Sequence, residues 1–112
     1  MTENDVTSLL TFCKNIWPDY FVDMSRSEGF ELIDEWKKAF ETVPRKKVLT
    51  AIYTLQDLAT PPNVDEILEK IDNSMGGINW PRLKESYMKH GYYWPEKYEQ
   101  KLQEVETCTT HG

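Results

Sequence analysis

Side chains that could carry out catalysis occur in the sequence, but their spacing does not gather them into a reacting group. The acid pairs Asp34-Glu35 and Asp65-Glu66 each lie within a predicted helix. Neighbours in sequence point in different directions on a helix, so neither pair forms a convergent acid–base dyad. Acids at a helix start usually act as caps or dipole partners. His90 lies at a predicted helix end, where a histidine is expected to bind the last carbonyl groups.

Phosphate-binding and metal-binding patterns are also missing from the sequence. Gly76-Gly77 is not followed by the lysine and hydroxyl residue of a phosphate-binding loop. Cys13 and Cys108 form no C-x-x-C unit, and neither lies at metal-ligand spacing from a histidine. We expect two reduced thiols, no metal and no cofactor. The sequence therefore does not predict an enzyme.

One basic run, Arg45-Lys46-Lys47, opens a predicted helix and has two interpretations. These side chains could bind phosphate groups of a nucleic acid. Alternatively they form a solvated corner, paired with acids of the preceding helix. Three bases are few compared with the phosphate contacts of a tight DNA binder. The solvated corner is the favoured interpretation, and the run is kept as the candidate nucleic-acid site.

The densest aromatic stretch spans residues 87–98 and includes Tyr92, Tyr93, Trp94 and Tyr98. Such side chains can pack on the core, anchor a protein interface or stack on bases. Core packing is the first interpretation and a protein interface the second. Base stacking comes last, because only three lysines lie nearby. We take these four residues as the candidate partner-binding site.

Hydrophobic spacing predicts helices throughout. The expected ranges are 3–16, 26–42, 44–59, 64–73, about 80–90 and about 95–107. Ser25-x-x-Glu28 and Asn63-x-x-Glu66 resemble capping boxes. Residues 18–24 are expected to form a connector, with Tyr20 and Phe21 tucked beneath the helices.

The apolar positions of the first 77 residues form stripes that would pack together. Trp36 lies in the central stripe, and the next stripe is Val48, Ala51, Ile52, Leu55 and Leu58. We predict an all-α fold: a small bundle of about four helices with a helical C-terminal extension. The glycine pair at 76–77 would divide a core domain, 1–77, from an extension, 78–112.

The composition limits the choice of partners. The chain has 112 residues and a net charge of −6, with −3 in residues 1–60 and −3 in residues 61–112. This balance opposes nonspecific binding to nucleic acid, so direct DNA binding is not expected. The polar, acidic start lacks the pattern of a signal peptide, and the apolar runs are too short to span a bilayer. The expected location is the cytosol, with no membrane partner.

The stretch "IDEWKKAFETVPRKKVLTAI", followed after a spacer by "ATPPNVDEIL", resembles the helicase loader/inhibitor proteins of phages of Gram-positive bacteria. The shared features are a tryptophan in a mid-chain helix, a valine–alanine helix after a short loop, and a proline pair before a short helix. Here Trp36, Val48 with Ala51, and Pro61-Pro62 with Ile67 hold those places. The resemblance covers roughly residues 5–72 and consists of core and cap residues.

The resemblance implies a function in phage DNA replication within the host cytosol. Proteins of that family bind the host hexameric replicative helicase, hold it inactive in solution and help to load it at the origin through an origin-bound initiator. The part after the core contacts the helicase in that family, which by position corresponds to residues 78–107. The alternatives are a small helical DNA-binding protein and a phage inhibitor of another host protein.

Overall fold

Helices are the regular secondary structure of the part of the chain that the structure describes, and turns and loops connect them. The computed structural model describes residues 1–74 and 77–111, with side chains described up to Glu104. This part contains seven helices and no strand: α1 (Glu3–Ile16), α2 (Pro18–Val22), α3 (Arg26–Ala39), α4 (Arg45–Thr54), α5 (Val64–Ser74), α6 (Trp80–Lys89) and α7 (Glu96–His111). The predicted all-α class is confirmed. A search of these helices finds none with the length and apolar character needed to cross a membrane.

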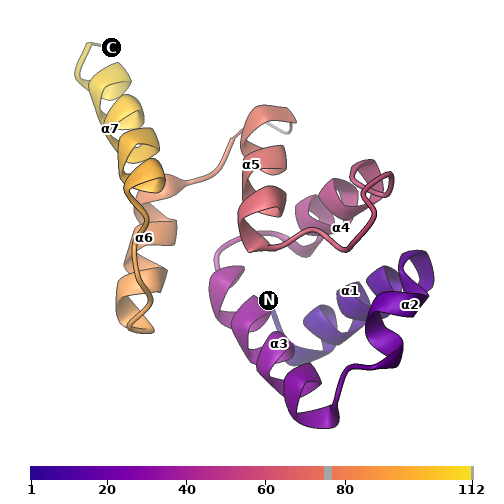
Figure 1. Ribbon diagram of the computed structural model, residues 1–112. Coiled ribbons are helices and arrows are strands. Elements are labelled where there is room, and N and C mark those ends of the chain that lie inside the picture. The colour runs from indigo at the N-terminus through magenta and orange to yellow at the C-terminus, as the bar shows by residue number, and fades with distance from the viewer. Residues whose placement is uncertain (75–76, 112) are drawn as a thin grey trace.

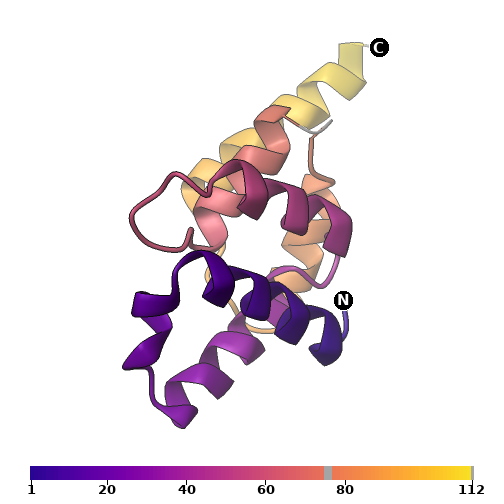
Figure 2. The same ribbon diagram turned by 90° about the vertical axis from the view of Figure 1, so that its right-hand side faces the viewer.

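The helices form a connected series of packed neighbours (Figure 1). Helix α1 contacts α2, α3 and α4, and α4 continues the packing to α5. Helix α3 contacts α6, which pairs with α7. Helices α6 and α7 run in opposite directions, and the end of α7 extends away from the other helices (Figure 2). The molecule is consequently elongated, with extents of 50 × 29 × 22 Å.

A single hydrophobic core joins all parts of this series. Its buried residues are Val6, Leu9, Cys13, Trp17, Trp36, Ala39, Phe40, Val43, Val48, Ala51, Ile52, Ile67, Leu68, Ile71, Trp80, Leu83, Tyr87, Tyr98 and Leu102. Trp36 is buried as predicted and packs edge-to-face on Phe40, with 5.5 Å between ring centroids. The last five residues of the list belong to α6 and α7. The proposed boundary at Gly76-Gly77 stays a prediction, and Gly76 lies outside the described residues.

Side-chain caps explain where several helices begin. At α5 the Asn63 side chain accepts a bond from the Glu66 amide (2.9 Å), and the Glu66 carboxylate accepts one from the Asn63 amide (3.2 Å). This reciprocal pair is the predicted capping box. At α3 the Ser25 hydroxyl accepts from the Glu28 amide as predicted, but Glu28 accepts the serine hydroxyl proton instead of the backbone amide proton. That box is therefore only half formed.

Two predictions about the connecting segments are wrong. Residues 18–24 contain the short helix α2, which begins at Pro18 because proline suits the first helical position. Tyr20 is 52% exposed instead of lying beneath the helices, whereas Phe21 is half-buried against the core.

Helix α4 ends at Thr54, five residues before the predicted end at residue 59. The indole Nε1 of Trp17 donates a hydrogen bond to the carbonyl of Leu58 at 2.7 Å. This bond uses a carbonyl group of the following loop and fixes that loop to the end of α1. Leu58 is 37% exposed and is not part of the α4 stripe.

Candidate functional site

Of the four aromatic residues predicted as a partner site, Tyr92, Tyr93 and Trp94 lie in the loop between α6 and α7, and Tyr98 lies on α7. Tyr87 contacts Tyr92, Trp94 and Tyr98, with ring centroids 5.8, 5.4 and 6.3 Å away. Trp80 packs against Tyr98 at 5.3 Å. We call these five rings the aromatic cluster. Burial raises the pKa of the Tyr87 hydroxyl well above its ordinary value, so Tyr87 remains neutral at any physiological pH.

A helix end positions the first two of the four predicted residues, Tyr92 and Tyr93, in the loop that follows it. After α6, Gly91 has a φ of 71° and its amide donates to the carbonyl of Met88, while the Tyr92 amide donates to that of Tyr87. This is a Schellman motif, which requires a residue with positive φ and therefore favours glycine. The accompanying contact is the edge-to-face pair Tyr87–Tyr92. The turn holds Tyr92 inward, and Tyr93 follows it.

Polar bonds fix the remaining two predicted residues. The indole Nε1 of Trp94 donates to Glu99 Oε2 at 2.8 Å, and Lys84 Nζ lies 3.0 Å from the same oxygen. The Tyr98 hydroxyl donates to Asp65 of α5. Burial and this bond raise the pKa of Tyr98 well above its ordinary value. These contacts give Trp94 and Tyr98 structural roles.

The structure therefore separates the four predicted partner-binding residues by their accessibility. Tyr98 is only 4% exposed, and Tyr92 and Trp94 are half-buried against the core. Tyr93 is 81% exposed. Among the four, Tyr93 is thus the side chain available to a partner, whereas the others support the loop that presents it.

The three bases of the predicted nucleic-acid site do not converge on one surface. Arg45 turns toward α1, where its Nη2 donates to Ser8 Oγ at 3.1 Å. Lys47 Nζ donates instead to the carbonyl of Gly77 at 3.4 Å, and Lys46 is exposed. Their different directions resemble a solvated corner more than a continuous phosphate-binding surface.

A polar junction that sequence reasoning missed connects the segment after α3 to α6. Glu41 Oε2 accepts from Ser86 Oγ and contacts His90 Nε2, each at 2.8 Å, and Lys89 Nζ lies 3.5 Å from Oε1. The bonds from Ser86 and His90 lower the pKa of Glu41 to about 2. Glu41 is more than forty residues away in sequence from Ser86 and His90, so no local sequence pattern predicts this junction.

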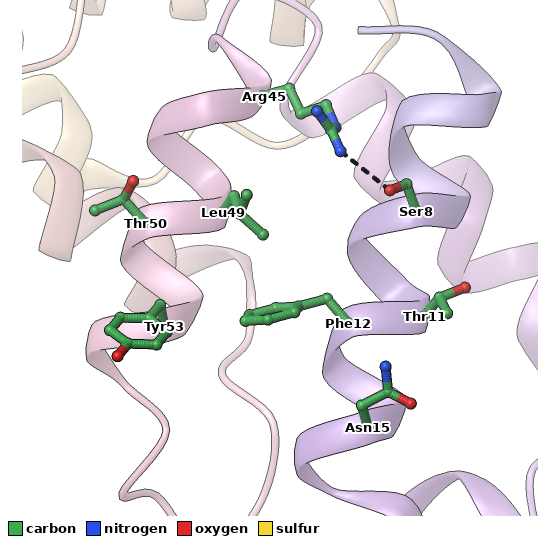
Figure 3. Close-up of a pocket in the computed structure, with 8 residues that line it drawn as sticks. All are labelled: Ser8, Thr11, Phe12, Asn15, Arg45, Leu49, Thr50 and Tyr53. Atoms are coloured by element: carbon green, nitrogen blue, oxygen red, sulfur yellow. Dashed lines mark hydrogen bonds between the residues drawn. The ribbon is translucent and has the colours of Figure 1, made fainter.

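A surface groove between α1 and α4 was likewise not predicted. Its volume is about 600 Å³. Figure 3 shows Phe12 directed across it toward α4, with Arg45 at one end bonded to Ser8. Each helix contributes four lining residues.

The structure offers no metal centre within the described residues, because no group of three histidine, cysteine, aspartate or glutamate side chains is placed to hold an ion there. Cys13 is buried in the core, and burial raises the pKa of its thiol to about 12. The thiol is therefore protonated and acts as a small apolar group. The side chain of Cys108 lies outside the described residues.

Comparisons of the chain with models of known protein families, with curated proteins and with solved structures found no significant match.

Proposed function

We propose that this chain is an adaptor of phage DNA replication. In this proposal it binds the hexameric replicative helicase of a Gram-positive host in the cytosol, keeps the helicase inactive in solution and helps to load it at the origin through the phage initiator. Helices α1, α3, α4 and α5 form the four-helix core of the adaptor, and α6 and α7 form the extension that contacts the helicase.

The observation that carries the proposal is the position of the residues on which the family resemblance depends. Trp36, Val48, Ala51 and Ile67 belong to one hydrophobic core, and Pro62 is buried as well. Buried side chains of suitable size and shape determine how helices pack. A resemblance located in such positions therefore concerns the packing of the fold, which supports a common architecture with the helicase loaders.

The exposed Tyr93 supplies a physical reason for placing the helicase contact on the α6–α7 loop. Tyrosine is enriched among the few interface residues that dominate binding energy. The loop that carries Tyr93 is held by the Schellman motif and by the Trp94–Glu99 bond. A preorganised anchor loses less conformational freedom on binding than a mobile one.

The test is calorimetric titration of the full chain into purified host helicase hexamer with ATP and Mg²⁺, together with a DNA-unwinding assay. We expect saturable binding and loss of unwinding. Tyr93→Ala should weaken binding by about 2 kcal/mol, or roughly thirtyfold, without changing the melting temperature of the free protein. Tyr20→Ala is the matched control, because Tyr20 is an exposed tyrosine on α2, outside the α6–α7 loop.

The results for the unaltered chain and for the Tyr93→Ala variant test two different claims, the helicase adaptor function and the location of the helicase contact. Absence of binding by the unaltered chain would overturn the helicase adaptor proposal, and affinity capture from host lysate would then identify which other host protein is inhibited. Normal binding by the Tyr93→Ala variant would overturn only the assignment of the α6–α7 loop.

A further inference from the structure

The groove between α1 and α4 is built from one stripe of each helix. Helix α1 supplies positions separated by three or four residues, and helix α4 supplies positions with a similar spacing. The lining residues are Ser8, Thr11, Phe12 and Asn15 from α1 and Arg45, Leu49, Thr50 and Tyr53 from α4 (Figure 3). Both stripes run along the helix axes, so the groove is open at the surface and elongated in the direction of the helices.

The groove presents apolar surface to an incoming group. Phe12 and Leu49 are half-buried and pack against the core, and Tyr53 is 57% exposed. The hydroxyls of Thr11 and Thr50 donate to carbonyls of their own helices at 2.8 and 2.9 Å. Because both hydroxyl protons are already in hydrogen bonds with the backbone, the two threonines would contact a ligand mainly through their methyl groups.

The charge of the groove differs from that of the rest of the molecule. The chain carries a net charge of −6, yet the groove lining contains one base and no acid. Four other surface hollows in the described part of the chain each include at least one acidic side chain. An acidic partner would therefore meet less repulsion here than at those hollows.

Arg45 can accept an acidic partner at one end of the groove. Its guanidinium bonds Ser8 through Nη2, and its Nε lies 4.0 Å from an Asp5 carboxylate oxygen. That carboxylate already accepts a bond from the backbone amide of Thr2 at 3.0 Å. A guanidinium has five N–H donors, so Arg45 retains donors for a carboxylate of another molecule.

We propose that this groove binds an amphipathic helix of a partner protein, with apolar side chains over Phe12, Leu49 and Tyr53 and a carboxylate on Arg45. Recognition of this kind places apolar residues at i, i+4 and i+7 of the bound helix in a hydrophobic groove. The inference goes beyond the proposed function, because it defines a second surface, away from Tyr93, and does not depend on the identity of the helicase.

The experiment uses the full chain and two stapled synthetic helices of about 14 residues, a length at which an unstapled helix is only marginally stable. Both carry leucines at i, i+4 and i+7. One ends in glutamate on the leucine face, and the other has lysine there. We expect the glutamate peptide to bind at least about fivefold more tightly. Amide and side-chain NMR shifts should change at Phe12, Leu49 and Tyr53.

Reversal of the charge at Arg45 gives the most direct test. Arg45→Glu should reverse the preference, so that the lysine peptide binds better. Arg26→Glu changes the net charge equally but lies at the start of α3, and it should leave the preference unaltered. Tyr53→Ala should weaken both peptides about tenfold, whereas Tyr20→Ala should not. Circular dichroism of each variant confirms that it is folded.

Several results would overturn the inference. These are equal affinity for the two peptides, no NMR shift at millimolar peptide, or the same effect from Arg26→Glu as from Arg45→Glu. Sedimentation of the free chain tests the other occupant, a second copy. A dimer that Arg45→Glu dissociates would assign the groove to self-association instead.

Discussion

At the scale of single residues, Glu41 shows how one carboxylate can connect distant segments. It follows α3 in sequence, and it accepts hydrogen bonds from Ser86 and His90 of the α6 segment. The carboxylate form is needed for these bonds, which is why the pKa of Glu41 falls to about 2. The side chain is partly exposed, so water reduces the energy of the junction.

The first prediction concerns acid stability. The folded pKa of Glu41, about 2, lies below its ordinary value of 4.5. The stabilisation is therefore complete above about pH 4.5 and is lost as the pH falls toward 2. After allowance for solvent screening we expect about 1 kcal/mol. Urea unfolding between pH 6 and pH 2 should show that Glu41→Gln has a flatter profile than the unaltered chain.

Glu31→Gln is the control for that profile, because it removes the charge of an exposed acid on α3. If Glu31→Gln and Glu41→Gln flatten the profile equally, overall charge and not the junction governs the acid transition.

The second prediction concerns the central tryptophan. Trp36 is buried against Phe40 within the core, so Trp36→Ala should lower the free energy of unfolding by about 3–5 kcal/mol. Chemical denaturation measures this change. Phe30→Ala, which alters an exposed ring on the same helix, should have little effect. A Trp36→Ala midpoint close to that of the unaltered chain would contradict the assigned burial.

At the scale of helices, the sequence predicted most of the elements because their signals are local. Apolar spacing places the start of α1 correctly, and the capping box at Asn63 does the same for α5. The misplaced end of α4 has a different cause. Its loop is fixed by Trp17, forty-one positions earlier in the sequence, through the bond to Leu58. No window of neighbouring residues contains that contact.

The candidate sites were predictable to different degrees for the same reason. The aromatic stretch is visible in the sequence, but the exposure of Tyr93 and the burial of Tyr98 depend on the turn at Gly91 and on Asp65 of α5. The α1–α4 groove combines one stripe from each helix. In the sequence, each stripe is an ordinary mixture of polar and apolar residues on one face of a helix. Only the packing of the two helices turns them into one surface.

The third prediction tests the cap of α5. Asn63→Ala removes the acceptor of the Glu66 amide, so it should cost about 1 kcal/mol of stability. Hydrogen exchange should locate the loss in the first turn of α5. Asn73→Ala near the exposed end of the same helix is the matched substitution, and it should be neutral or slightly stabilising because alanine favours helix. Equal losses from both variants would contradict the capping role.

At the scale of the whole molecule, the C-terminal helices are attached through both apolar and polar contacts. Of the nineteen core residues in the described part of the chain, five belong to α6 and α7. Asp65 binds the Tyr98 hydroxyl and lies 3.0 Å from Lys97 Nζ. Asp72 accepts from Trp80 Nε1 and lies 3.3 Å from Lys101 Nζ. Helix α5 therefore adds polar contacts to α6 and α7 beside the packing of α3 against α6.

The last prediction concerns how much α6 and α7 contribute to the stability of residues 1–77. A chain of residues 1–77 retains fourteen of the nineteen core residues that the structure describes, so it should remain helical and melt cooperatively. It should melt at least about 10 °C lower than the full chain, because a loss of about 2 kcal/mol shifts the melting temperature by this much in a domain of such size. Circular dichroism and calorimetry measure both properties in one buffer. An unfolded 1–77 chain would make α6 and α7 part of a single cooperative unit. An unchanged melting temperature would mean that the contacts of Asp65 and Asp72 do not stabilise the core.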